Sequence, residues 1–246
     1  MITITEPRVE LIAHTTLACN GRSPAIEGHM SLDPDAGDMQ QLVEFAGRSC
    51  YESFRKPNPA TARNADYIAR TLHEQKHWSI AEHATATFYI TGVSRALTHE
   101  LVRHRHLSYS QLSQRFVDES WAYFVIPPAV EKSEAETIFN TGDGYIMQER
   151  LSGALEHWGN EAQRNYGVLV DALTAEGLPR KQAREAARAV LPNMVETRIV
   201  VTGNLRAWHE VIERRTAPDA DAEFQQVAGM IRQELQRLAP EVFPAP

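Results

Sequence analysis

The sequence predicts a single α+β domain that spans residues 1–246. Apolar residues recur at strand period in a few short segments, and every three or four residues in longer segments that are typical of helices. No internal repeat, low-complexity tract or obvious linker divides the chain. A chain of 246 residues can bury roughly 70–75% of the surface that its unfolded form exposes, which is enough for one sizeable core.

Three strands are expected along the chain. The first lies near the start, where Val9 and Leu11 have the spacing of residues on one face of a strand. The second is ATATFYITG at 84–92, and the third is TRIVVTG at 197–203, a run typical of a buried strand. Before the second strand, residues 20–38 are rich in Gly, Pro, Asp and Ser, which predicts a long surface loop.

Helical spacing of apolar residues predicts seven helices. Asp38 and Asn64 are expected to cap the first two, with the sequence KPNP at 56–59 as the break between them. The third contains Leu97 and Leu101, and we expect it to carry the basic segment that follows. The other four are expected over residues 145–176, 180–190, 204–215 and 224–238. The first of these four is expected to face the core.

The composition indicates a cytoplasmic enzyme with neither nucleic acid nor membrane as a partner. Acidic residues outnumber basic ones by 32 to 25, so no overall positive field attracts a nucleic-acid backbone. No apolar stretch approaches the ~20 residues that cross a bilayer, and no secretory signal is visible. Two cysteines are too few for a disulfide scaffold, and we expect Cys50 to be a small buried hydrophobe.

The densest group of chemically useful side chains is RHRHLSYSQLSQR, residues 103–115. It contains three arginines, two histidines, three serines and two glutamines, few of which belong in a core. Arginine presents a planar fork of donors that matches phosphate, while Ser and Gln can hydrogen-bond a base or a sugar. Composition alone also fits a solvated helix end and a polar loop, so it is the order of the residues that favours a nucleotide site.

That order, RHRxxSxxxxSxR, resembles the signature of the flavin-dependent thymidylate synthase family. Further segments resemble the same family, namely EFAGRSCYESFRKPNP at 44–59, HWSIAEH at 77–83 and RKQAREAARAVLPNMVETRIVVTGNLRAW at 180–208. The resemblance spans roughly residues 40–215. It implies an α+β fold with a central, mostly antiparallel sheet flanked by helices.

The resemblance also implies an activity. Enzymes of this family are methyltransferases that convert dUMP to dTMP, with FAD as cofactor, 5,10-methylenetetrahydrofolate as carbon donor and NADPH as reductant, and they release tetrahydrofolate. The implied assembly is a homotetramer whose active sites lie between subunits. The family activates uracil without adding an enzyme cysteine to it, so Cys50 is not expected to be a nucleophile. No metal site is expected.

The matching positions assign residues to the two ligands. By similarity, the residues that contact FAD are Ser79, Arg103, His104, Arg105, Gln111, Asn204, Arg206 and Glu210. Those that contact dUMP are Glu100, Arg103, Gln111, Leu112, Ser113, Gln114, Arg115, Arg188 and Arg215. Arg215 matches the catalytic arginine, which favours ionisation of uracil at N3 and so makes C5 more nucleophilic.

The sequence departs from the family at two places. Glu210 stands where many members have His or Asn, and His209 lies one position earlier. Either His209 is displaced from the site, or Glu210 places a carboxylate near the flavin, where it opposes the negative charge of the reduced form. After Arg215, Pro218 and Asp219 replace a more ordinary helical start. We therefore expect modest turnover, and the alternative is a catalytically impaired relative that binds flavin and dUMP.

A different class of enzyme is suggested by HEQKHWSIAEH at 73–83. A zinc metalloprotease would use His73, His77 and His83 as ligands and Glu74 as the base. Ile80 stands where such proteases have Gly, which makes this a remote alternative.

A basic stripe forms a separate feature of the predicted 180–190 helix. Lys181, Arg184 and Arg188 lie at i, i+3 and i+7, a spacing that ordinarily gives a solvated helix face. Of the three, only Arg188 matches a functional position of the family. The charge of Lys181 and Arg184 raises the hypothesis that they attract the folate tail.

Overall fold

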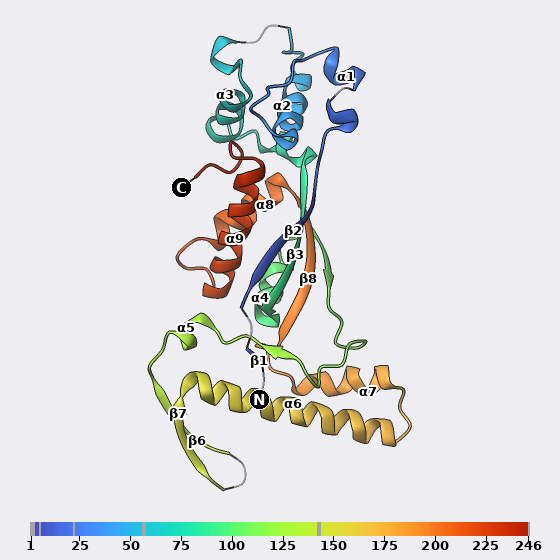
Figure 1. Ribbon diagram of the computed structural model, residues 1–246, viewed down its shortest axis with the longest axis vertical. Helices are drawn as coiled ribbons and strands as arrows, with labels where there is room; N and C mark the ends of the chain where they lie inside the picture. Colours follow the sequence, from blue (N-terminus) through green and yellow to red (C-terminus); the bar gives the residue numbers. More distant parts are fainter. Residues whose placement is uncertain (1–2, 5, 22, 56–57, 142–143, 246) are drawn as a thin grey trace.

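The computed structural model describes residues 3–4, 6–21, 23–55, 58–141 and 144–245 (Figure 1). The molecule is elongated, with a tier of short helices at one end, a sheet in the middle and a long helix lying across the other end. The helices of the first tier are α1 (Pro24–Glu27), α2 (Asp38–Cys50) and α3 (Asn64–Ile68). Those at the opposite end are α6 (Leu151–Ala175) and α7 (Arg180–Ala187). The predicted loop 20–38 therefore contains a short helix, α1, while residue 22 lies outside the described residues.

The central sheet has four strands in the order β2-β3-β8-β4, and every neighbouring pair is antiparallel. The strands are β2 (Arg8–His14), β3 (Thr85–Ser94), β8 (Glu196–Asn204) and β4 (Leu107–Gln111). The α+β fold with a mostly antiparallel central sheet is therefore confirmed. A separate parallel pair joins β1 (Thr3–Ile4) to β5 (Tyr123–Phe124).

Two helices, α8 (Leu205–Arg215) and α9 (Ala222–Leu238), pack on the sheet and close the main core. Alternate residues of β3, among them Phe88, are fully buried on the face that these helices cover. Trp208 of α8 packs edge-on against Phe88, with ring centroids 5.1 Å apart, and its Nε1 donates to the carbonyl of Ala86 at 3.1 Å. Helix α8 begins where the sequence predicts, and α9 begins two residues earlier than predicted, at Ala222, because Asn204 and Asp221 accept hydrogen bonds from the first free amides.

The first two predicted helices exist, but their expected caps have other roles. Asp38 is the first residue of α2, and its side chain accepts a hydrogen bond from the amide of Leu17 at 2.9 Å. Asn64 is the first residue of α3, and its buried side chain bonds to Gln40 and Glu44. Long-range partners therefore outcompete local capping at both positions. Of the predicted break, residues 56–57 lie outside the described residues, and Asn58 caps a 3₁₀ turn, η2 (Pro59–Thr61).

The prediction that a helix carries the basic segment is wrong. Helix α4 (Arg95–Leu101) ends before Arg103, and the segment continues as a turn and then as strand β4. The hydroxyl of Tyr109 donates to the carbonyls of Leu101 and His104, which holds the turn. Pairing of β4 with β8 then decides its conformation, since tertiary pairing overrides local helical spacing.

The predicted 145–176 helix begins later and is less buried than expected. Residues before α6 form a hairpin of β6 (Glu136–Asn140) and β7 (Ile146–Arg150), which follows a short helix, α5 (Pro128–Glu131). Along α6 only Ala154, Gly159 and Tyr166 are buried, whereas Val168 is 66% and Trp158 is 42% exposed. Only one member of the apolar stripe that predicts this helix is buried, so the expectation that the stripe faces the core is wrong; its members are Leu151, Leu155, Trp158, Ala162, Tyr166, Leu169 and Leu173.

Two smaller expectations concern the cysteines and membrane association. Cys19 and Cys50 are both exposed free thiols, so the expectation that Cys50 is buried is wrong. The reason is that Cys50 is the last residue of α2, beyond the part of that helix that packs on the core. Within the described residues, no helix is both long and apolar enough to cross a membrane.

Candidate functional site

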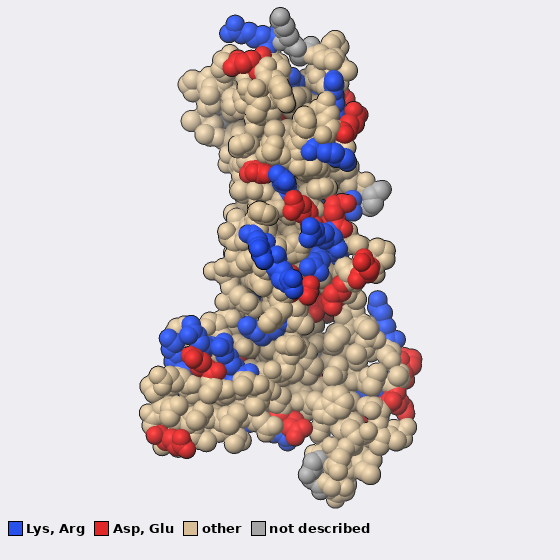
Figure 2. Space-filling view, turned by 180° about the vertical axis from the view of Figure 1, so that it is seen from behind, with Lys and Arg blue, Asp and Glu red and all other residues tan. Residues whose placement is uncertain are grey.

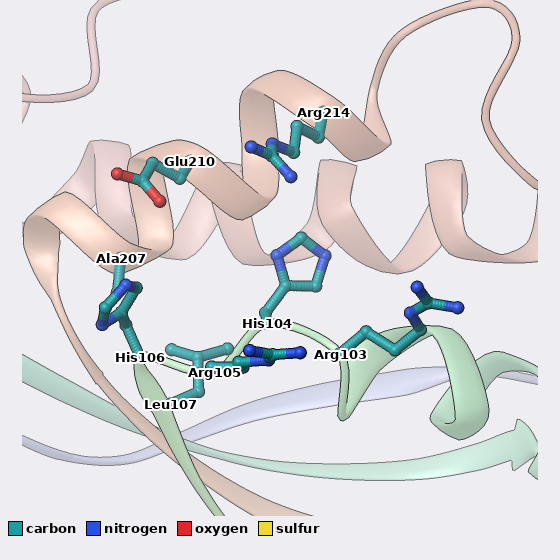
Figure 3. A pocket seen from close by; sticks show the side chains of 8 residues that line it. All are labelled: Arg103, His104, Arg105, His106, Leu107, Ala207, Glu210 and Arg214. Atoms are coloured by element: carbon teal, nitrogen blue, oxygen red, sulfur yellow. The ribbon is translucent and has the colours of Figure 1, made fainter.

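A cavity of about 200 Å³ lies where the turn after α4 faces helix α8 (Figure 3). Its lining residues are Arg103, His104, Arg105, His106, Leu107, Ala207, Glu210 and Arg214. In Figure 3 the turn supplies the histidines and two arginines from one side, while Glu210 and Arg214 reach toward them from α8. Residues far apart in the sequence thus meet because β4 pairs with β8, which leads directly into α8.

Three arginines of this cavity have free donors. The side chains of Arg103, Arg105 and Arg214 make no hydrogen bond or ion pair with another described residue. Lys and Arg also gather at mid-height on the face of the molecule seen in Figure 2. Guanidinium groups without a protein partner are well suited to an anionic ligand, phosphate above all.

Two further hollows adjoin the arginine-lined cavity. One, of about 170 Å³, shares His106, Ala207 and Glu210 with it, and is also lined by Glu82, Asn204 and Arg206. The other, of about 500 Å³, shares Arg206 and Glu210 with the hollow of about 170 Å³, and of these two only Glu210 also lines the arginine-lined cavity. It is also lined by Lys76, His77, Trp78, Ser79 and His209. Seven of the eight residues predicted to contact FAD line this connected surface, and Gln111 is the exception.

Glu210 lies on this surface and is ion-paired. Arg206 contacts Glu210 at 3.4 Å and Glu82 at 2.6 Å, so the carboxylate is partly balanced by a cation. His209 faces the largest of the hollows and stacks on Trp78, with ring centroids 3.7 Å apart and an interplanar angle of 9°. Both side chains therefore line the connected surface, with the Glu210 carboxylate in all three hollows and the His209 imidazole held against an indole in the hollow of about 500 Å³.

Arg215 is held at the edge of the cavity by contacts with three elements. Its Nε donates to Nε2 of His104 at 3.0 Å, and its Nη1 lies 3.0 Å from a carboxylate oxygen of Glu100. The guanidinium carbon also lies 4.8 Å from the ring centroid of Phe224. Burial, together with Arg215 and Arg214, lowers the pKa of His104 to about 4.

The other predicted dUMP residues lie at the far end of β4. Nε2 of Gln111 donates to the hydroxyls of Thr98 and Thr197, at 3.0 and 3.2 Å, so Gln111 is bound within its own chain. The amide of Leu112 donates to the carbonyl of Arg198 at 2.9 Å. Gln114 is buried, and its side-chain nitrogen has no partner among the described residues.

Helix α7 contacts the loop that follows strand β4. Arg184 donates to the carbonyl of Phe116 and to the carboxylate of Asp118, both at 2.7 Å. Lys181 lies with its ammonium 4.8 Å from the ring centroid of Phe116. This part of the basic stripe therefore contacts the protein and is not simply solvated. Nη1 of Arg115 lies 3.6 Å from Glu185 of the same helix.

Within one chain, the structure does not bring the two groups of predicted dUMP residues together. Glu100, Arg103 and Arg215 lie at the start of β4, whereas Ser113 to Arg115 follow its end. A strand of five residues separates the groups by roughly 13 Å. Arg188 belongs to the second group, because it begins the 3₁₀ turn η5 (Arg188–Val190) directly after α7, and α7 is the helix whose Glu185 lies next to Arg115.

Several residues of the site were missed by the sequence interpretation. Arg214 and His106 line the arginine-lined cavity, and Glu82 orients Arg206. His106 and Glu82 lie inside segments that resemble the family, and Arg214 precedes Arg215, so a position in or beside a motif was the available signal. Near the second group, Arg95 and Glu119 each have a buried side-chain atom without a partner among the described residues, and no motif marks either of them. Burial raises the pKa of Glu119 to about 7.

The zinc alternative is not supported by the geometry. His73 and Glu74 lie in a π-helical turn, η3 (Ala69–Glu74), whereas His77 and His83 belong to the following 3₁₀ segment, η4 (Trp78–His83), and its cap. Lys76 between them has a φ of 61°, which breaks the helix that zinc binding would require. His73 is bonded to the carbonyl of Glu241 at 2.8 Å. No group of three or more candidate ligands occurs in the described parts of the chain.

The fold and the site define an α+β protein with a cationic cleft of a kind that suits phosphorylated ligands. The family model described as thymidylate synthase complementing protein matches residues 34–241. A flavin-dependent thymidylate synthase of Mycobacteroides abscessus is 46% identical over 99% of this chain and 91% of its own. The enzymes of that name from Mycolicibacterium gilvum and Mycobacterium tuberculosis are 47% and 45% identical, over 99% and 96% of this chain and 91% and 88% of their own. The chain therefore belongs to the flavin-dependent thymidylate synthase family.

Proposed function

We propose that this protein binds FAD along the connected hollows and converts dUMP to dTMP. Its carbon donor is 5,10-methylenetetrahydrofolate, its reductant is NADPH, and tetrahydrofolate is released. The observation that carries the proposal is the position of Arg215, which Glu100 and His104 hold at the edge of a cavity lined by arginines. The family membership supplies the chemistry to which that geometry is fitted.

The residues present fit a flavin nucleotide. Arg103, Arg105 and Arg214 offer donors that no other described residue occupies, as a diphosphate requires. Ser79 and Asn204 line adjoining hollows and add neutral hydrogen-bonding groups. When bound, the flavin supplies the hydride chemistry, and the protein supplies orientation and electrostatics.

Arg215 acts on the uracil ring through its charge. A fixed guanidinium next to N3 favours the deprotonated imide over the neutral one, because it stabilises the negative charge in a partly buried site. No thiol is required for this step. Cys50, the last residue of helix α2, is an exposed free thiol.

A homotetramer with shared active sites accounts for two features of the isolated chain. The first is the separation of the two groups of dUMP residues along β4. The second is the amount of apolar surface on α6 and near it, such as Val168 and the 90% exposed Trp121. Large exposed apolar patches usually mark interfaces. A single domain over residues 1–246 and a cytoplasmic location complete the proposal.

The test is dTMP formation by anaerobically prepared protein that is given FAD, NADPH, dUMP and methylenetetrahydrofolate. The Arg215→Ala variant is expected to lose at least about 100-fold in kcat, because it removes the charge that polarises uracil. Arg237→Ala is the matched control, since Arg237 is exposed on α9 and, among the described residues, pairs only with Glu234. Equal turnover in the two variants would exclude the role given to Arg215.

The second candidate is a catalytically impaired relative that binds flavin and dUMP. The observation that favours it is the Glu210 carboxylate on the surface of the cavity, where it opposes the charge of a reduced flavin. A yellow protein that binds dUMP but forms no dTMP would establish this candidate in place of the first.

A further inference from the structure

His104 lines the arginine-lined cavity and also contacts Arg215. We propose that His104 is a positioning residue: as a neutral imidazole it accepts a hydrogen bond from Nε of Arg215 and thereby fixes the plane of the guanidinium that acts on uracil. The inference rests on the proposed function, because that function assigns the uracil ring to Arg215.

The backbone that carries His104 is itself held in place. The amide of His104 donates to the carbonyl of Leu101 at 3.1 Å, which closes the end of α4. The carbonyl of His104 accepts from the hydroxyl of Tyr109 at 2.8 Å, and burial raises the pKa of that hydroxyl to about 12, so it stays a donor. The imidazole therefore projects from a fixed turn, as a positioning residue must.

The guanidinium of Arg215 is held on three sides. His104 holds its Nε edge, Glu100 holds Nη1, and Phe224 covers one face. Its side chain is only 19% exposed. Nη2 has no partner among the described residues, so one edge of the planar group remains for a ligand. Since two edges are already bound, the direction in which Nη2 points is set by His104 and Glu100 together.

The hydrogen bond fixes the protonation of the histidine. Arginine stays protonated, so Nε of Arg215 can only donate, and Nε2 of His104 must accept. If His104 were an imidazolium, its Nε2–H would face the Nε–H of Arg215, and this hydrogen bond could not form. The charged groups that face the ring come from two elements. From α8 they are Glu210, Arg214 and Arg215, and from α4 and its following turn they are Glu100, Arg103 and Arg105; the turn also places the titratable His106 in the same cavity.

These surroundings disfavour a charged ring. Burial is the largest cause of its lowered pKa, followed by Arg215 and Arg214, while Glu210 and Glu100 act in the opposite direction. Helix α9 contributes only the edge of Phe224, 6.1 Å away between centroids. The single proton of the neutral ring then lies on Nδ1, which has no partner among the described residues. Nδ1 is therefore left as a donor for an acceptor atom of a ligand in the cavity.

The direct test is ¹⁵N NMR of the full chain labelled at its histidine ring nitrogens, with His104→Gln to assign the signal. His104 is expected to be neutral, with Nδ1 protonated, from pH 7.5 to about pH 5.5, a range in which an ordinary histidine with a pKa of about 6.5 becomes charged. Arg215→Ala should raise the pKa of His104 and weaken the preference for this tautomer. An imidazolium at pH 6, or a proton on Nε2, would overturn the inference whether or not the protein makes dTMP.

A kinetic test uses two variants that differ at the acceptor. His104→Gln keeps an oxygen that can accept from Arg215, whereas His104→Phe fills a similar volume with no acceptor. We expect kcat to fall at least about tenfold further in the Phe variant, with a smaller change in KM for dUMP. His99→Gln, at an exposed position of α4, is the matched control and should leave both constants unchanged. Equal losses in the Gln and Phe variants would overturn the positioning role, and absence of dTMP from the unmodified protein would instead count against the proposed function.

Discussion

The two ends of strand β4 differ in how complete they are within one chain. At the start of β4, Arg215 finds partners in Glu100 and His104, and the cavity beside it is closed by α8. At its end, Gln114 and Arg95 keep buried side-chain nitrogens without partners in the described residues, and Arg188 is exposed. Buried polar groups are normally satisfied, so an unsatisfied group points to something that is missing. The difference indicates that the contacts of Arg215 are complete within one chain, whereas the second end has buried groups that a ligand or another subunit would satisfy.

The strongest test of this difference between the two ends of β4 is complementation between two inactive variants. Arg215→Ala damages the first end of β4, and Arg115→Ala damages the second. If each site combines the two ends from different subunits, mixed tetramers that contain both variants have native sites again, about a quarter of the total in a random equal mixture. We therefore expect coexpression to restore dTMP formation to that level from losses of about 100-fold in each variant alone.

The control pairs two variants of the same end. Coexpression of Arg215→Ala with His104→Phe should restore nothing, because both changes affect contacts of one cluster. If the first pair recovers no activity, both ends serve one site from a single chain. If the control pair recovers activity, Arg215 and His104 do not act in the same site.

The next largest effect concerns the exposed apolar surface of α6, which includes Val168. Val168→Asp is expected to break the proposed tetramer, because a buried unpaired carboxylate at an apolar interface costs several kcal/mol. Sedimentation velocity measures the loss of assembly, and dTMP formation should fall with it. Gln233→Asp, at an exposed position of α9, is the control. A tetramer that survives Val168→Asp would show that this part of α6 is free in the assembly.

A smaller effect is expected at the first end of β4. Replacing Glu210 with His removes a negative charge from the cavity surface, so turnover should rise by about two- to tenfold. The loss of its ion pair with Arg206 limits the gain, although Glu82 still holds that arginine. Anaerobic turnover measures the effect, with Glu213→His, on an exposed face of the same helix, as control. A fall in turnover would mean that the carboxylate assists the reaction.

The last effect is on stability and not on turnover, and it concerns Glu119, near the second end. Its pKa of about 7 in the folded chain exceeds the ordinary 4.5, so the folded state holds a proton that the unfolded state releases, and stability falls as the pH rises from about 4.5 to 7. Glu119→Gln should therefore raise the free energy of unfolding at pH 8, by on the order of 1–3 kcal/mol, and change it little at pH 4.5. Denaturant unfolding at both pH values measures this, with the exposed Glu131→Gln as control. An equal effect at the two pH values would rule out the raised pKa.

Residue patterns were sufficient where local and long-range interactions agree. The alternation in β3, the run in β8 and the stripe of α9 predicted elements that the structure contains, because burial against the core follows the same period as the backbone. The order of residues in 103–115 was likewise enough to indicate the family. Seven of eight predicted flavin residues line one connected surface, because strands and helices carry motif neighbours to the same place.

The sequence by itself determined the fold class, most of the elements and the family of this protein. Only the tertiary structure decided that the basic segment is a turn and a strand, that the stripe of α6 is exposed, and that Arg215 is bound to His104. Each of these depends on groups more than 80 residues apart in sequence, or on a surface that a second chain would have to cover. Local periodicity records which side chains are apolar, but strand pairing and long-range hydrogen bonds determine what those side chains meet.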